Sequence, residues 1–197
     1  MIDIDLLQID DFLDAAACET LRAELQQAAG ASATVHGLTE AVRPQIRRTT
    51  RAAMPPAIRD RVTGLLLAQK DALERHFGVA LDTCEEPQFL RYGPGDFFVA
   101  HQDGNTPILF DDSRFRKISA IIFLSASSPE PRPGTYGGGV LTFHDPVFGS
   151  PRRLPLTPPP GTFIAFRAET THEVTPVTHG ERFTIVSWYR SGDSAQR

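Results

Sequence analysis

Cysteine is scarce in this sequence of 197 residues, which contains only Cys18 and Cys84. Two thiols do not make a disulfide framework, so a reducing cytoplasm is the simplest expected compartment. The opening residues, Met1-Ile2-Asp3-Ile4-Asp5, are acidic and lack the basic-then-apolar layout of a secretory signal. No apolar run approaches the roughly 20 residues that a membrane-spanning helix needs. We therefore expect a cytoplasmic protein with no membrane partner.

An excess of positive charge is missing as well. The chain has 20 Lys and Arg against 24 Asp and Glu, a formal net charge of −4. That balance argues against nucleic acid as a partner. The hydrophobic fraction of 41% with 22% charged residues is typical of globular proteins and excludes a disordered chain. The length suits a single domain over residues 1–197.

Helical periodicity is confined to the first part of the chain. Asp14 is a suitable cap for a helix whose apolar residues recur at helical spacing and which we expect Gly30 to end. Pro55-Pro56 opens a second apolar stripe, which we expect to form one helix ending at Gly78. Residues 31–45 between the helices lose the period and are expected to form a loop.

Short β-rich segments separated by Pro and Gly follow from about residue 87. The strand candidates are residues 88–92, 117–124, 140–143, 162–166 and 182–189, with a further short one at 46–51. Pro129–Gly139 is rich in Pro and Gly and is expected to be a mobile surface loop. We predict a mostly β fold with α support: a double-stranded β-helix, or jelly roll, over about residues 87–190, buttressed by the N-terminal helices of about 10–80.

Three potential metal ligands have an informative spacing. His101 and Asp103 stand two apart, so on an extended segment both side chains point to the same face. His172 would arrive from another strand. Two imidazoles and one carboxylate form a facial ligand set that leaves coordination positions open, as in non-haem Fe(II) enzymes that activate oxygen.

Arg182 follows the distal histidine by ten residues and lies in an apolar strand candidate. A buried guanidinium needs a carboxylate partner, because burying the bare charge is costly. Its planar fork suits a carboxylate. Thr184, on the same strand face, could add a hydroxyl donor. The metal ligands together with Arg182 suggest an oxygenase with a keto-acid cosubstrate.

The chain resembles the Fe(II)/2-oxoglutarate-dependent dioxygenases, and most closely their prolyl 4-hydroxylase-like branch. The resemblance covers about half of the chain, roughly residues 88–190. Its motifs, in order, are Arg91-Tyr92-Gly93-Pro94-Gly95-Asp96-Phe97-Phe98-Val99-Ala100-His101-Gln102-Asp103, Gly138-Gly139-Val140-Leu141-Thr142-Phe143, Gly161-Thr162-Phe163-Ile164-Ala165-Phe166, His172-Glu173-Val174 and Arg182-Phe183-Thr184-Ile185-Val186-Ser187-Trp188-Tyr189.

The resemblance implies roles for particular residues. His101, Asp103 and His172 would hold Fe(II), and Arg182 would bind the distal carboxylate of 2-oxoglutarate. Tyr92 is similar to the family tyrosine that donates to the same carboxylate, and Trp188 matches an aromatic residue lining the pocket. An ordinary core role is the alternative for both aromatic residues.

The same resemblance implies a hydroxylase that uses Fe(II), 2-oxoglutarate and O2, with ascorbate as a candidate addition, and that releases succinate and CO2. The expected substrate is an unactivated C–H bond of a prolyl residue in a protein or peptide. The alternatives are a hydroxylase of a free amino acid or other small molecule, and a jelly-roll iron- or oxygen-sensing module without turnover. A plain metal site needs no carboxylate clamp, so Arg182 argues against the module.

Several features stay open. Residues 104–116 and 129–139 are expected to frame the mouth of the pocket, since both are polar or Pro/Gly-rich and flank the metal segments. Gly138-Gly139 either punctuates a loop or permits a close approach of substrate. Four arginines either hold an anionic substrate or a partner or form a solvated edge: Arg43, Arg47, Arg48 and Arg51.

Overall fold

The computed structural model describes residues 4–34, 42–104, 111–145 and 152–192. Within these ranges the largest sheet has eight strands. Across this sheet they run β1 (Leu6–Ile9), β13 (Phe163–Arg167), β8 (Arg116–Phe123), β16 (Arg182–Arg190), β6 (Gln88–Tyr92), β4 (Thr50–Ala52) and β2 (Gly30–Ser32), with β5 (Thr83–Cys84) paired to β16.

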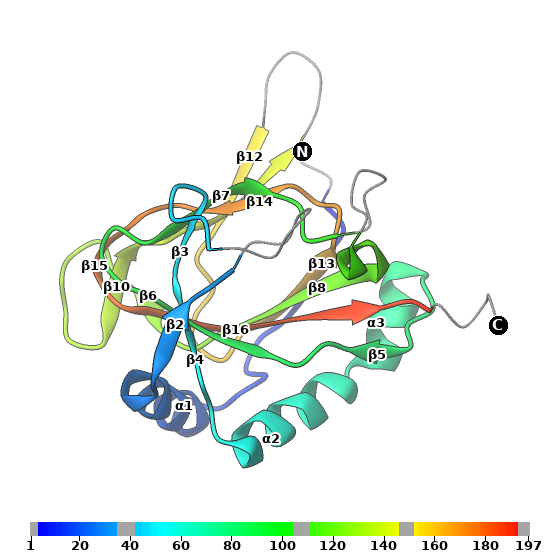
Figure 1. Ribbon diagram of the computed structural model, residues 1–197, viewed down its shortest axis with the longest axis horizontal. Helices are drawn as coiled ribbons and strands as arrows, with labels where there is room; N and C mark the ends of the chain where they lie inside the picture. Colours follow the sequence, from blue (N-terminus) through cyan, green and yellow to red (C-terminus); the bar gives the residue numbers. More distant parts are fainter. Residues whose placement is uncertain (1–3, 35–41, 105–110, 146–151, 193–197) are drawn as a thin grey trace.

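Two smaller sheets and the helices complete the described elements. The five-stranded sheet runs β12 (Arg152–Leu156), β11 (Leu141–Asp145), β14 (His172–Val174), β7 (Phe97–His101) and β3 (Arg47–Arg48), and the three-stranded sheet runs β15 (Val177–Gly180), β10 (Thr135–Gly138) and β9 (Ala126–Ser127). The helices are α1 (Ala15–Gln27), α2 (Pro56–Leu67), α3 (Lys70–Phe77) and the short 3-10 helix η1 (Asp112–Phe115). Figure 1 shows α1 and α2 beneath the large sheet and β7, β14 and β12 on its other side.

Two apolar layers hold these parts together, one on each face of the large sheet. Alternate residues of a strand point to opposite faces, and β8 illustrates this. Ile118 and Ile122 pack with the helices, in a cluster that includes Leu25, Leu66 and Leu73. Ile121 and Phe123 pack on the other face, against Leu141 and Phe143 of the five-stranded sheet. The expected fold is therefore confirmed: a mostly β jelly roll with helices buttressing one face.

The strand candidates of the β-rich part are confirmed to within two residues at each end. They correspond to β6, β8, β11, β13 and β16. The first helix also begins as predicted, since the Asp14 side chain accepts a hydrogen bond from the Ala17 amide at 2.7 Å. The chain also has strands that the sequence did not indicate, such as β1 and β12, because they are short or mix polar residues with apolar ones.

Of the two glycines that were predicted to end helices, only Gly78 does so. Helix α1 ends at Gln27, and Gly30 instead begins β2, whose three residues are all exposed. The prediction that residues 31–45 form a loop is thus wrong at its start, because an edge strand of small exposed residues has no apolar period. The helix expected from Pro55-Pro56 to Gly78 is two helices, broken at Ala68 and Gln69, although Gly78 does end the second in a left-handed conformation. The buried stripe continues across the break, so the period concealed it.

The short strand expected at residues 46–51 is in fact two strands in different sheets. Arg47 and Arg48 pair with β7, whereas Thr50–Ala52 pairs with β6. Thr49 lies at the crossover, and its hydroxyl donates to the Arg91 carbonyl at 2.9 Å. Alternation alone does not reveal a change of sheet. Among the described residues, no helix is long and apolar enough to cross a membrane.

Candidate metal centre

The three predicted metal ligands meet at one end of the cavity between the sheets. His101 and His172 are directly opposite each other in the antiparallel pair β7–β14, with their ring centroids 4.3 Å apart. Asp103 lies beyond the end of β7, where its amide donates to the Ala168 carbonyl at 2.9 Å. One ligand atom from each of the three side chains lies within 4.8 Å of the others. The expected shared face thus forms, although Asp103 itself is not on the strand.

Backbone carbonyls orient both imidazoles. Nδ1 of His101 lies 2.8 Å from the Val99 carbonyl, and Nδ1 of His172 lies 2.9 Å from the Thr170 carbonyl. A carbonyl only accepts, so each Nδ1 carries the proton and each Nε2 keeps a free lone pair. These Nε2 atoms lie 3.5 Å from the two oxygens of Asp103. A histidine fixed in this way is a prepared metal ligand.

The protonation states also suit a divalent cation. Burial raises the pKa of Asp103, but the neighbouring imidazoles of His172 and His101 and the hydrogen bond from the Ser119 hydroxyl lower that pKa well below its usual range. Burial, and then the proximity of the His101 imidazole, lowers the pKa of His172 to about 4. At neutral pH the carboxylate is therefore ionised and the His172 imidazole is neutral, which are the forms that bind metal.

Arg182 lies in the same cavity without an acidic partner. The side chain is 2% exposed, and in the part of the chain that the structure describes its Nε has no hydrogen-bond partner. One Nη donates to the Thr184 hydroxyl at 3.4 Å, and among the described residues no carboxylate lies within the 4.0 Å of an ion pair. Its guanidinium carbon is 5.3 Å from the ring centroid of Tyr92, its cross-strand partner. A buried guanidinium without a carboxylate partner has the charge and the donors that suit an anion.

Gly139 leaves space for the side chain of Arg182. It has φ +56°, and a Cβ at this position would lie 2.9 Å from Cδ of Arg182. Glycine is therefore required for the stem of the arginine to pass. Gly138 also has a positive φ, and a Cβ there would meet the Pro176 carbonyl. The glycine pair makes room for the protein's own arginine and backbone.

All seven predicted site residues line one cavity: Tyr92, His101, Asp103, His172, Arg182, Thr184 and Trp188. The rest of the wall is largely apolar and includes Leu90, Ile121 and Val174. Sequence reasoning did not identify Arg116, which also lines the cavity.

Arg116 organises one side of this cavity. Its Nε and one Nη each donate to a carboxylate oxygen of Glu85 at 2.7 Å, and the other Nη donates to the Asp103 carbonyl at 3.2 Å. Its guanidinium carbon lies 3.8 Å from the Trp188 ring centroid. Arg116 is the first residue of the apolar strand β8, so the reasoning applied to Arg182 would have found it.

The four clustered arginines do not act as one group. Arg47 is 7% exposed and lines the cavity, whereas Arg48, next to it, points outward to Asp96 at 3.7 Å. Arg43 and Arg51 are exposed. The cluster is divided, because alternation along β3 sends adjacent side chains to opposite faces.

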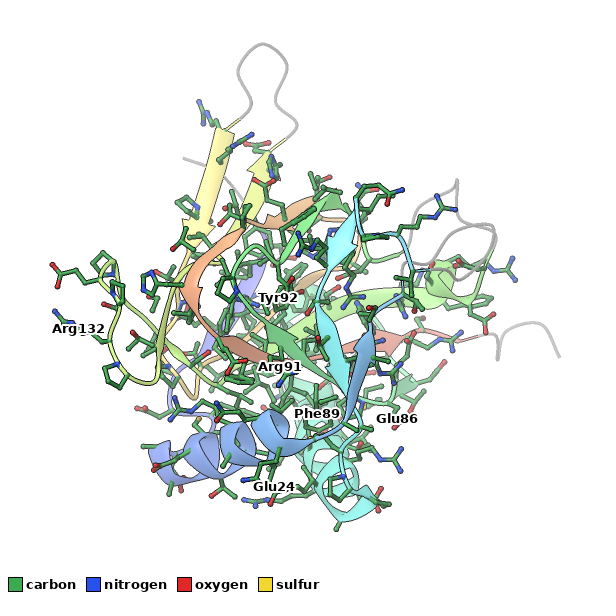
Figure 2. All side chains as sticks on the ribbon, turned by 60° about the vertical axis from the view of Figure 1, so that its left-hand side comes forward. Glu24, Glu86, Phe89, Arg91, Tyr92 and Arg132 are labelled. Carbon is green, nitrogen blue, oxygen red and sulfur yellow. The ribbon has the colours of Figure 1, made fainter. Side chains whose placement is uncertain are left out.

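The two expected mouth segments also differ. In residues 104–116, Ser113 and Arg116 line the cavity, while 105–110 lie outside the described residues. The second segment, 129–139, does not line it. Four of its eleven residues form strand β10, where Tyr136 is 1% exposed, and Figure 2 shows Arg132 at the outer tip of its turn, away from Tyr92. The expectation that this segment frames the pocket is therefore wrong, whereas residues 129–134 do form an exposed surface loop.

Comparison with known proteins agrees with this geometry. Residues 87–190 match the family model of the 2OG-Fe(II) oxygenase superfamily. A PKHD-type hydroxylase of Klebsiella pneumoniae (strain 342) is 36% identical over 132 residues, which cover 64% of this chain and 54% of the relative. One from Burkholderia lata is 37% identical over 131 residues, covering 63% and 53%. The chain spans about half the length of these curated relatives.

Solved structures show the same fold. A Pseudomonas putida prolyl-4-hydroxylase matches with a TM-score of 0.69 at 23% identity, over 96% of this chain and 94% of the other. A prolyl hydroxylase of Trichoplax adhaerens, in complex with a peptide fragment of hypoxia inducible factor, matches with a TM-score of 0.69 at 16% identity, over 94% and 83%. At such identities the likeness concerns the fold.

Proposed function

The chain belongs to the 2OG-Fe(II) oxygenase superfamily, and from this premise we propose that it is a hydroxylase acting on a prolyl residue of a protein or peptide. The observation that carries the proposal is the meeting, in one cavity, of a facial His/Asp/His set and a buried arginine without a carboxylate. The choice of prolyl substrate is supported by the PKHD-type hydroxylases and prolyl hydroxylases that the chain resembles.

His101, Asp103 and His172 would hold Fe(II) and leave three coordination positions open. When bound, iron and 2-oxoglutarate would supply the oxygen activation, with succinate and CO2 as coproducts. Arg182 would bind the far carboxylate of 2-oxoglutarate through its planar fork. Thr184 and Tyr92 flank that guanidinium and would add hydroxyl donors to the same carboxylate.

The other residues of the cavity wall would exclude solvent and hold the site residues in position. Apolar residues such as Leu90, Ile121 and Val174 would keep water from the reacting carbon. Arg116, neutralised by Glu85, would hold the Asp103 backbone and one face of Trp188 in place. These residues would therefore position the site and exclude water, and the cofactors would carry out the oxidation.

We also propose that residues 1–197 act as one domain, because the helices share a single apolar cluster with the large sheet. Cys18 and Cys84 are both free and buried, which supports a reducing compartment such as the cytoplasm.

A turnover assay tests the proposal. The protein is supplied with Fe(II), 2-oxoglutarate, O2 and ascorbate, and succinate is measured together with a +16 Da product on proline-containing peptides and free amino acids. We expect a hydroxylated peptide. Arg182→Ala should lose turnover at limiting 2-oxoglutarate, while Arg190→Ala, an arginine of the same strand outside the cavity, serves as the control. Hydroxylation of free amino acids alone would favour the small-molecule alternative. If no succinate forms, the proposal that the protein is an enzyme of this kind is contradicted.

A further inference from the structure

Arg47 is a second buried arginine without an acidic partner in the cavity. It is 7% exposed, one Nη donates to the Thr34 carbonyl at 3.0 Å, and its Nε has no partner among the described residues. Within the described residues no carboxylate forms an ion pair with it, in contrast to Arg48 and Arg116. A guanidinium has five donors, so a buried one with so few partners is costly unless a ligand completes it.

Arg47 lies on the same sheet as the two histidines of the metal set, whereas Arg182 lies on the large sheet. Arg182 comes from β16 of the large sheet, whereas Arg47 comes from β3 of the five-stranded sheet, directly opposite Phe98 of β7. The Phe98 ring stacks on His101 with centroids 3.5 Å apart, and the guanidinium carbon of Arg47 lies 4.8 Å from the Phe98 centroid. Arg47 is thus one aromatic ring away from a proposed metal ligand.

Charge balance indicates what Arg47 lacks. With the proposed cofactors bound, the two positive charges of Fe(II) and that of Arg182 are offset by Asp103 and the two carboxylates of 2-oxoglutarate. Arg116 is neutralised by Glu85. The charge of Arg47 then remains as the uncompensated one on the described wall of the cavity. A buried, uncompensated charge attracts a group of opposite sign.

We infer that Arg47 binds a carboxylate of the substrate, next to the carbon that is hydroxylated. This inference rests on the proposed function and narrows its substrate class to molecules with a negative charge near the reacting proline. The carboxylate has two sources: an acidic side chain beside the proline, or a free terminal carboxylate. The planar fork of Arg47 is suited to either.

Binding of matched probes tests the inference without turnover. The protein is loaded with Mn(II) in place of Fe(II) and with 2-oxoglutarate, and the fluorescence of Trp188 is followed. Trp188 is the single tryptophan of the chain and lines the cavity. The first probe pair is N-acetylproline and N-acetylprolinamide. The second is acetyl-Pro-Asp-amide and acetyl-Pro-Asn-amide. Each pair differs in one negative charge, and the two pairs distinguish the two sources.

For at least one pair, we expect the charged probe to bind about 10-fold or more tightly to the wild-type protein. Arg47→Gln should reduce that ratio to near one, and Arg47→Lys should keep part of it, since lysine retains the charge without the fork. Arg48→Gln, the outward neighbour, should keep the full ratio. Retained 2-oxoglutarate binding in Arg47→Gln shows that the site is intact.

A ratio near one in the wild-type protein for both pairs would overturn the inference, and so would a ratio that survives Arg47→Gln. A purely structural role of Arg47 against Phe98 would shift both members of a pair equally and leave the ratio unchanged. If the charged probes bind through Arg47 but Fe(II) and O2 give no +16 Da product, the carboxylate site stands and the hydroxylase proposal fails.

Discussion

The two faces of strand β16 differ sharply although they belong to the same nine residues. Phe183, Ile185 and Tyr189 point toward the helices and are part of the large apolar cluster. Arg182, Thr184 and Trp188 alternate with them and line the cavity. One face contributes to stability through apolar burial, and the other places the buried polar groups of Arg182 and Thr184 in the cavity. The difference shows that this single strand carries both tasks, separated by its two-residue period.

The largest expected effect comes from removing the charge at the metal set. Asp103→Ala should weaken Fe(II) or Mn(II) binding by more than about 100-fold and abolish turnover, because two imidazoles alone leave the cation without a carboxylate. Metal titration measures this. Glu173→Gln is the control, since Glu173 is adjacent to His172 but faces His144 at 3.2 Å. Normal metal affinity in Asp103→Ala would remove this residue from the set.

The helix-facing side is tested by Ile185→Ala. This residue is 1% exposed, so truncation should lower the free energy of unfolding by about 2–5 kcal/mol through lost burial and a cavity. Denaturant unfolding measures the loss. The folded fraction should bind 2-oxoglutarate with unchanged affinity, because the side chain points away from the cavity. A large change in that affinity would mean that the two faces are not independent.

On the cavity face of the same strand, Arg182→Ala should have the reverse profile. We expect 2-oxoglutarate to bind about 100-fold more weakly, which corresponds to the loss of a charge-assisted pair in a desolvated site. The metal affinity and the denaturation midpoint should change far less. Isothermal titration with 2-oxoglutarate checks the first, and Arg182→Lys should recover only part of the affinity. Unaltered affinity in Arg182→Ala would move the clamp to another residue.

The smallest expected effect is that of Thr184→Val, which replaces a hydroxyl by a methyl group of similar size. The hydroxyl accepts from Arg182 at 3.4 Å, a long bond, so 2-oxoglutarate affinity should fall by about 2- to 10-fold. Thr184→Ser keeps the hydroxyl and should stay near the wild-type value. Equal losses in both variants would assign the effect to packing.

The sequence predicted strand β16 and the residues on its cavity face. Arg182 in an apolar strand is chemically conspicuous, and the histidines and Asp103 are arranged in a recognisable order. Arg116 carries the same signal and would have followed from the same argument. The pairing of Arg116 with Glu85, about 30 residues away, is a tertiary contact that periodicity does not indicate.

Arg47 shows why part of the site was out of reach. It stands beside Arg48, and the two are chemically identical in the sequence. Only the pairing of β3 with β7 decides that one points into the cavity and the other to solvent. The same segment changes sheet at Thr49, a step that leaves no mark in composition. The edge strand β2 was missed for a related reason, since exposed small residues resemble a loop.

The direct pairing of β7 and β14 has a consequence for folding kinetics. His101 and His172 are paired across these strands, and β14 is only three residues long. A cation shared by both would cross-link two segments separated by roughly 70 residues, a loop whose closure is entropically unfavourable for the free chain. Binding to the native state alone would then slow unfolding and protect the amides of both strands from hydrogen exchange. The cation would therefore act as a reversible cross-link between the two strands. Its removal by a chelator should allow β14 to unfold before the rest of the sheet.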